Sequence, residues 1–540
     1  MRNREYRSIR LILSGAASVV AMAVASPALA AGRCENLAQL RLADTVIRSA
    51  TPVAAGAFVG PDKVKHSELP AFCRVIAEVK SAPDSDIAVE VWLPDEHWAG
   101  VFHGNGSGGF AGIAALGYPG MIAGLRRGYA TAGTDMGTAP ATPLNGDPLI
   151  GHPQKWKDWG FRSTHVMTVT GKAIAKAFYG AEPRRAYYTG CSTGGQEGLI
   201  EAQYYPDDYD GVLIGAPVVN RTWGHALAVW DWQAANGLPG RKLSDAKLAL
   251  VNRAVLTDCG GLANGLKSDP FLADPSVCRF DPASLTCKGA ASEACLTPGE
   301  VDTVKAYYSG PLNHAGRATY YGWMRGSEAP GLFGWNFLES PPNNEPAFDG
   351  LFKWVFGAGW DWKAFDFDRD MPKVDAVLGP DLNGAMRGDM SRFEARGGKL
   401  IIYQGWADTL VAPMQTLDLY KKLIARAGGV AKGKRFARLF FAPGMEHCGG
   451  GAGPAAFNAA NAGTNGPLSD TPRDDLFVAL SRWVEHGDAP ARVVATKLVN
   501  GKPVMRRPLC AWPQKAWYRG SGDTNDAASF VCAAAKPKAG

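Results

Sequence analysis

Several patterns that mark whole classes of protein are missing from this sequence. The net charge is only +6 over 540 residues and the basic residues are scattered, so no nucleic-acid partner is indicated. There is no Cys-x-x-Cys pair, which disfavours metal sites. No glycine-rich segment carries a Gly-Lys-Ser/Thr ending or a dinucleotide fingerprint, which argues against a phosphate-binding loop. No internal repeat is present.

Apolar segments long enough to cross a membrane are also missing beyond the N-terminus. Residues 1–10 are basic, residues 11–25 form an apolar run, and the small residues Ala28 and Ala30 follow. A membrane anchor needs about 20 apolar residues, and this run is shorter and ends in a cleavage pattern. We therefore expect a signal peptide over residues 1–30, and no membrane association once it is removed.

All ten cysteines lie beyond that segment. An even number of cysteines in an exported chain indicates disulfides, because the compartment outside the cytoplasm is oxidising. We expect a secreted or periplasmic protein with as many as five bridges.

Strand-like and helix-like segments alternate in two parts of the chain. The first part has strand patterns at residues 87–92, 100–102, 129–133, 185–189 and 211–215, and helical patterns at residues 166–179 and 195–204. The rhythm resumes with strands at 399–403 and 437–441 and a helix at 414–427. This alternation predicts an α/β fold with a mostly parallel sheet covered by helices on both faces.

The region between the two parts, residues 217–398, is irregular. It holds four cysteines and half of the sixteen tryptophans: Trp223, Trp230, Trp232, Trp323, Trp335, Trp354, Trp360 and Trp362. We interpret it as an inserted lid domain, with a catalytic domain in two parts, residues 31–216 and 399–540. The tryptophans either form an aromatic face on this lid or simply fill its core.

Residues 190–194 read Gly-Cys-Ser-Thr-Gly and stand between a predicted strand and a predicted helix. This is the Gly-x-Ser-x-Gly nucleophile elbow in the setting that it requires, since glycines must flank the serine in a sharp, strained turn. The motif predicts an α/β-hydrolase fold with Ser192 as nucleophile.

A serine nucleophile needs a general base, and the base needs a carboxylate that fixes its tautomer. In α/β-hydrolases these groups follow the serine in the order acid, then histidine. Asp408 follows the strand at 399–403, and His447 follows the strand at 437–441, so we predict these two residues as the triad partners. The rival histidines His103 and His165 precede the serine, and a structural role is favoured for both.

The glycine-rich segment at residues 103–109 has a separate expected task. Its backbone N–H groups in the 106–109 stretch, Gly108 and Gly109 above all, are predicted to bind the oxyanion of acyl transfer together with the N–H of Thr193. The alternative, a phosphate cradle, lacks its characteristic lysine.

Two cysteines stand next to the proposed catalytic pair. Cys191 immediately precedes Ser192, and Cys448 immediately follows His447. If the serine and the histidine meet, their neighbours come within the roughly 7 Å between Cα atoms that a disulfide allows. We therefore predict a Cys191–Cys448 bridge over the alternative that each pairs elsewhere, and a cysteine nucleophile is disfavoured for the same reason.

Three stretches resemble the tannase and feruloyl esterase family: Gly-Cys-Ser-Thr-Gly-Gly at 190–195, Tyr-x-Gly-Trp-Ala-Asp at 403–408, and Pro-Gly-Met-Glu-His-Cys-Gly-Gly-Gly at 443–451. The resemblance extends from Cys34 to Cys532. It supports the Cys191–Cys448 bridge and implies four further pairs: Cys34 with Cys73, Cys259 with Cys278, Cys287 with Cys295, and Cys510 with Cys532. Family members cleave gallate, ferulate and related aromatic esters, and one branch cleaves a terephthalate monoester.

The sequence departs from the family pattern in three places. The lid of the family carries a calcium loop rich in aspartate, but here residues 257–266 keep only Asn264 at a matching side-chain position, with Asp258 shifted by one. Calcium needs about six to eight oxygen ligands, so we expect no calcium and no other cofactor. Gln404 and Thr138 replace two histidines common in the family; neither position belongs to the triad, so activity is not expected to suffer.

These observations predict an exported serine esterase that hydrolyses small esters of phenolic acids, such as feruloyl or galloyl esters, through an acyl-enzyme on Ser192. Two alternatives stay open. An acyltransferase would use the same triad, and a secreted binding protein would keep the fold without the chemistry.

Overall fold

The computed structural model describes residues 27–340, 345–458 and 468–537. Residues 1–26 of the predicted signal peptide lie outside the described residues, and the described chain begins with helix α1 (Pro27–Asn36). Within the described residues no helix is long and apolar enough to span a bilayer.

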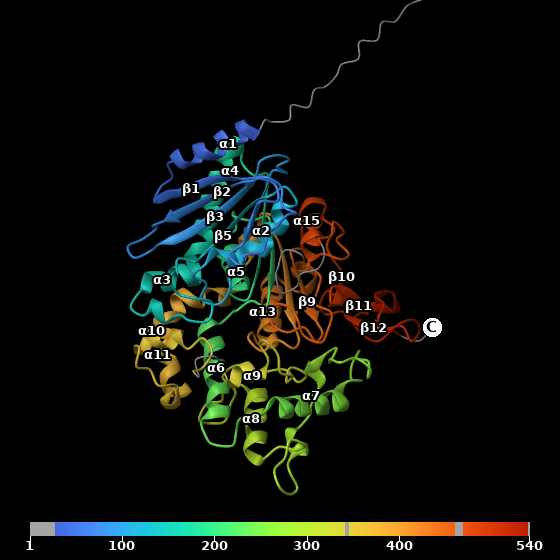
Figure 1. The fold of residues 1–540 in the computed structure, drawn as a ribbon. Coiled ribbons are helices and arrows are strands. Elements are labelled where there is room, and N and C mark those ends of the chain that lie inside the picture. Colours follow the sequence, from blue (N-terminus) through green and yellow to red (C-terminus); the bar gives the residue numbers. More distant parts are fainter. Residues whose placement is uncertain (1–26, 341–344, 459–467, 538–540) are drawn as a thin grey trace, which may run out of the picture.

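A nine-stranded mixed sheet forms the centre of the molecule (Figure 1). Its spatial order is β1-β2-β3-β5-β4-β6-β7-β8-β9. The strands are β1 (Thr45–Val53), β2 (Phe72–Val79), β3 (Ile87–Pro94), β4 (Val101–Asn105), β5 (Ala130–Thr134), β6 (Arg185–Cys191), β7 (Gly211–Gly215), β8 (Lys399–Gly405) and β9 (Ala437–Ala442). The strands from β5 to β9 in this order run parallel to their neighbours, as expected, whereas β1, β2 and β3 add antiparallel pairs at one edge.

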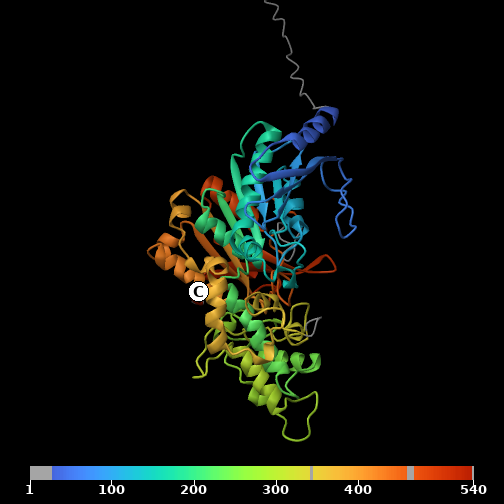
Figure 2. The ribbon, with the colours of Figure 1, turned by 90° about the vertical axis from the view of Figure 1, so that its left-hand side faces the viewer.

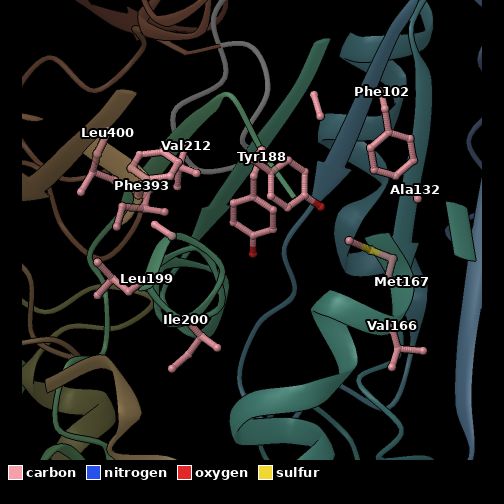
Figure 3. Close-up of a cluster of buried hydrophobic side chains, with 14 of the residues drawn as sticks. Phe102, Ala132, Val166, Met167, Tyr188, Leu199, Ile200, Val212, Phe393 and Leu400 are labelled. Carbon is pink, nitrogen blue, oxygen red and sulfur yellow. The ribbon is translucent and has the colours of Figure 1, made fainter. Parts of the chain in front are cut away.

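Helices cover both faces of this sheet. On one face lie α4 (Ser163–Tyr179), α5 (Thr193–Tyr204) and α13 (Pro413–Arg426), and on the other lie α2 (Tyr118–Leu125) and α15 (Leu476–His486). Successive strand residues alternate between the two cores, since Tyr188 packs in the first and Tyr187 in the second. Figure 3 shows the first core, where side chains of α4 and α5 meet those of the sheet: Val166, Met167, Leu199, Ile200, Phe102, Ala132, Val212 and Leu400.

The chain between β7 and β8 lies at one end of the sheet in both views (Figures 1 and 2). We call residues 217–398 the lid segment; its domain boundaries remain a prediction. Its helices are α6 (Arg221–Asn236), α7 (Asp245–Cys259), α8 (Pro298–Ser309), α9 (Trp335–Glu339), α10 (Gly350–Phe356), α11 (Phe367–Leu382) and α12 (Ser391–Ala395). Because β7 is parallel to β6 and β8, the lid segment leaves the sheet at the end where those strands terminate.

The lid tryptophans fill cores. Trp323 and Trp335 pack in one buried cluster with α8, and Trp354 packs in a second with α10 and α11. Trp360 stacks on Phe352 within that second cluster. All eight lid tryptophans belong to the described residues, and none of them lines either of the two pockets at Ser192. The structure therefore favours core packing over an aromatic face.

The C-terminal part adds short strands beyond α15. They are β10 (Arg492–Val499) paired with β11 (Lys502–Cys510), and β12 (Lys515–Tyr518) paired with β13 (Phe530–Ala533). The helix α3 (Pro153–Lys157) precedes α4, and α14 (Val430–Gly433) precedes β9.

All ten cysteines lie in the described ranges and are paired in disulfides, so no cysteine is free. The bridges are Cys34–Cys73, Cys191–Cys448, Cys259–Cys278, Cys287–Cys295 and Cys510–Cys532. These are the five pairs expected from the residues and from the resemblance, and they fit a secreted protein.

Candidate active site

Ser192 occupies a strained turn between β6 and α5. Its backbone angles, φ of 63° and ψ of −120°, lie in a region that residues other than glycine rarely adopt. The flanking glycines are required, because a Cβ on Gly190 would lie 2.5 Å from the carbonyl oxygen of Gly194, and a Cβ on Gly195 would lie 2.5 Å from that of Gly215. The predicted nucleophile elbow is therefore present in its full geometry.

Asp408 and His447 meet beyond the ends of β8 and β9. The carboxylate of Asp408 is fully buried, and both of its oxygens lie 3.0 Å from Nδ1 of His447. Oδ1 also accepts hydrogen bonds of 2.9 Å from the N–H groups of Leu410 and Val411. Since an ionised carboxylate only accepts, the Nδ1 of His447 carries the proton and Nε2 is left as the basic nitrogen.

Ser192 and His447 line one pocket of about 500 Å³, which we call the outer pocket. The disulfide next to them, Cys191–Cys448, has its Cα atoms 5.9 Å apart. The structure thus brings the three predicted residues together, with the lid residue Phe333 placing its ring edge-on to His447.

The rival histidines lie elsewhere. His103 is fully buried with Nε2 2.9 Å from Oγ1 of Thr189, and burial lowers its pKa to about 3. His165 stacks on Tyr205 and lies 2.6 Å from Asp208. Neither lines a pocket at Ser192, which agrees with the structural role expected for both.

The glycine-rich loop is held against the elbow. The carbonyl oxygen of Gly109 accepts hydrogen bonds of 2.9 Å from Oγ1 of Thr193 and from Nε1 of Trp159. Gly109 has a φ of +54°, and a Cβ there would lie 1.9 Å from the carbonyl oxygen of Pro143. Across the described ranges, no protein acceptor is bonded to the N–H groups of Thr193, Gly108 or Gly109. Gly109 lines two spaces at Ser192, Gly108 lines the first of them, the outer pocket, and Thr193 lines the second; the oxyanion role of their N–H groups stays a prediction.

Sequence reasoning missed the part that Gln404 plays. Its fully buried side chain donates from Nε2 to Oδ2 of Asp408 at 2.9 Å, and its Oε1 accepts from Oγ1 of Thr416 at 2.8 Å. Gln404 is the last but one residue of β8 and stands four positions before Asp408. That short spacing was the sequence signal from which a contact between the two side chains could have been predicted. Thr138, the other departure, donates only to the backbone oxygens of Phe110 and Asp135.

We expect Gln404→Leu to lower kcat about tenfold, because Asp408 loses a hydrogen bond to a charged group worth about 1.5–3 kcal/mol in general, and to destabilise the fold as well. Gln404→His, which restores the residue common in the family, supplies a ring N–H and should keep most of the activity. Steady-state kinetics with a soluble aryl ester and a melting curve for each variant measure the two effects. An undiminished kcat in the leucine variant would show that the triad does not depend on this bond.

The Cys191–Cys448 bridge should serve both stability and geometry. It spans 257 residues, and a chain-entropy estimate for such a loop gives on the order of 5 kcal/mol. We expect the double variant Cys191→Ala with Cys448→Ala to lose activity by about a hundredfold well below its melting temperature, since a shift of about 1 Å between reacting groups can cost that much. The matched control is Cys510→Ala with Cys532→Ala, which removes a bridge whose cysteines line neither pocket at Ser192. A folded double variant at 191 and 448 with full activity would contradict this role.

Comparison with known proteins shows which fold this architecture shares. The crystal structure of feruloyl esterase B from Aspergillus oryzae superposes with a TM-score of 0.83 at 27% identity, covering 93% of this chain and 100% of that one. The shared fold, with a strand-turn-helix serine and a nine-stranded mixed sheet, defines the chain as an α/β-hydrolase-like protein.

The model of the family described as "Tannase and feruloyl esterase" matches residues 73–533, and the chain belongs to this family. An uncharacterized esterase of Xanthomonas campestris pv. campestris is 36% identical over 97% of this chain and 95% of its own length. The mono(2-hydroxyethyl) terephthalate hydrolase of Piscinibacter sakaiensis is 32% identical, over 89% of this chain and 88% of its own. The chain is therefore a carboxylic ester hydrolase, and its family acts on aromatic esters.

Proposed function

We propose that the protein is a secreted or periplasmic serine esterase that hydrolyses esters of phenolic acids such as feruloyl or galloyl esters. In the first step Ser192 attacks the ester carbonyl while Nε2 of His447 takes its proton, and the alcohol leaves with that proton. In the second step His447 activates water, which releases the acid from Ser192.

The observation that carries this proposal is the hydrogen bonding of His447. Its Nδ1 donates to a buried Asp408 that is itself held by two backbone N–H groups. This leaves Nε2 as the basic nitrogen of a ring that lines the same pocket as Ser192. The N–H groups of Thr193, Gly108 and Gly109 supply the donors for the oxyanion.

No step requires a metal. In residues 257–266, the stretch that matches the calcium loop of the family, Asp258 is the one carboxylate. The matching Asn264 uses its Nδ2 to donate to the carbonyl oxygen of Ala516 at 2.9 Å. These residues do not supply the several carboxylate oxygens of a calcium site, and we propose an esterase without cofactors.

A panel of methyl gallate, methyl ferulate and mono(2-hydroxyethyl) terephthalate, with and without an added alcohol, tests the function. Release of free acid from the phenolic esters supports hydrolysis. If the main product is a new ester of the added alcohol rather than the free acid, the protein is an acyltransferase. If none of the esters is turned over, the protein is a binding protein.

A further inference from the structure

A second, smaller space lies beside Ser192, on the side of helix α6. This inner cavity has a volume of about 40 Å³ and shares four lining residues with the outer pocket: Gly109, Ser192, Phe348 and Leu410. The two spaces therefore meet at the nucleophile. A cavity of this size exceeds the roughly 10–15 Å³ that one water needs, so it accommodates the polar edge of a ring but not a whole aromatic group.

Arg221, in the first turn of α6, brings an unpaired donor to the inner cavity. The residue is buried and lines this cavity. Its Nε donates to Oε1 of Gln196 at 2.7 Å, its Nη1 donates to Oγ1 of Thr193 at 3.2 Å, and the guanidinium lies over the ring of Trp159. Nη2 has no acceptor among the residues that the structure describes. Burial lowers the pKa of Arg221 to about 9, so the group is still charged at neutral pH.

A carboxylate does not neutralise this arginine directly. Glu197 acts on Arg221 through its charge, without a hydrogen bond between the two side chains. The oxygens of Glu197 instead accept from the N–H of Ser107 and the hydroxyls of Thr164 and Tyr188. A buried charge is costly when it lacks hydrogen-bond partners, so the free Nη2 points to a ligand group that accepts hydrogen bonds.

His225 lies one turn further along α6, on the same face of the helix, and brings an acceptor. Its Nδ1 is 3.1 Å from the carbonyl oxygen of Phe348. A carbonyl only accepts, so Nδ1 carries the proton and Nε2 presents a lone pair. No donor of the described chain reaches Nε2, and the ring lines the inner cavity. Burial, helped by the charge of Arg221, lowers the pKa of His225 to about 3, which keeps the ring neutral.

We propose that Arg221 and His225 together bind a hydroxyl group on the aromatic acyl part of the substrate. The hydroxyl oxygen accepts from Nη2 of Arg221, and its proton is donated to Nε2 of His225. This assignment rests on the proposed function. It places the hydroxyl-bearing edge of the aromatic ring in the inner cavity, with the rest of the ring where the two spaces meet, against Phe348 and Leu410. The alcohol part is left to the outer pocket.

The same pair disfavours a carboxylate at this position. One carboxylate oxygen would pair with Arg221, but the other has no proton to give to the lone pair of His225. Specificity for the hydroxyl follows, because a site built to hydrogen-bond a substrate hydroxyl rejects analogues that leave its buried groups unpaired.

The test compares kcat/KM for methyl 3-hydroxybenzoate, methyl 4-hydroxybenzoate, methyl benzoate and monomethyl terephthalate. We expect the better hydroxylated isomer to exceed methyl benzoate by about 10- to 100-fold, the effect of hydrogen bonds to a charged partner, and the terephthalate monoester to fall below methyl benzoate. The ratio of hydroxylated to plain ester is then measured in the variants, where the intrinsic reactivity of each ester cancels.

His225→Asn and His225→Gln form a matched pair. An asparagine amide nitrogen takes the place of Nδ1 and retains the bond to Phe348, but it offers no acceptor where Nε2 stood, so the ratio should fall about tenfold. Glutamine extends an acceptor towards the Nε2 position and should keep a larger part of the ratio. His103→Asn is the control, because His103 is also buried but lines neither pocket, and it should leave the ratio unchanged.

Hydrolysis of 4-nitrophenyl acetate, whose acyl group carries no ring, separates this proposal from the proposed function. Suppose that the wild-type protein cleaves 4-nitrophenyl acetate. The assignment of Arg221 and His225 is then wrong if the ratio of hydroxylated to plain ester is near one, if the terephthalate monoester is preferred, or if the His225→Asn variant keeps the wild-type ratio. In each of these cases the proposed esterase function is still supported. Failure to cleave 4-nitrophenyl acetate and all four methyl esters overturns both.

Discussion

Ser192→Ala is expected to remove ester hydrolysis almost completely, with a loss of about 10⁶-fold in kcat as found for nucleophiles of catalytic triads. The substitution takes away the one oxygen that attacks the carbonyl, while the backbone of the elbow stays the same. Alanine meets the same unfavourable φ of 63° as serine, so we expect the melting temperature to change little. Initial rates with 4-nitrophenyl acetate and a thermal denaturation curve measure both quantities.

A covalent probe gives an independent reading of the same prediction. A fluorophosphonate should label the wild-type protein on the peptide that contains residues 190–195 and should not label the variant. Retention of more than a few per cent of the activity by a folded Ser192→Ala protein, or labelling at another serine, would move the nucleophile to a different residue.

The parallel part of the sheet was predictable from the sequence because its strands are buried on both faces. The strand at Gly211–Gly215 is apolar throughout and flanked by turns, and its predicted bounds are those of β7. Of the antiparallel edge, β3 was predicted as a strand at residues 87–92, but β1, β2 and the antiparallel pairing were not. The residues of β1 are mostly half-buried or exposed, and a β-bulge between Ile47 and Ser49 interrupts its alternation, so the strand carries no clear period.

For the catalytic triad the sequence was informative, because the α/β-hydrolase mechanism fixes the residue types and their order along the chain. The elbow motif and the order of serine, acid and histidine led to Ser192, Asp408 and His447, which the structure brings together. The supporting contacts could not be predicted in this way, because they join residues with no local pattern. His225 bonds to Phe348 across 123 positions, and Arg221 bonds to Thr193 across 28. Such contacts depend on how the lid segment packs against the elbow.

Asp408→Asn should lower kcat by about 10⁴-fold at neutral pH, the loss that follows when a triad histidine takes the wrong tautomer. In the wild-type protein Oδ1 accepts from the N–H groups of Leu410 and Val411, and Oδ2 accepts from Nε2 of Gln404. Both oxygens lie 3.0 Å from Nδ1 of His447. An asparagine keeps its oxygen towards the two backbone N–H groups, so its NH₂ group replaces Oδ2.

That NH₂ group would donate to Nδ1 of His447 instead of accepting from it. The proton of the neutral imidazole then moves to Nε2, where it prevents the ring from taking the proton of Ser192. Asp408→Glu serves as the control for charge, because it keeps a carboxylate but displaces it, and its loss should be smaller if tautomer rather than position dominates. Rates are compared with 4-nitrophenyl acetate at a temperature where circular dichroism shows all three proteins folded. A folded Asp408→Asn protein with the wild-type rate would mean that another group orients His447, and the acid would then have to be sought outside the loop that follows β8.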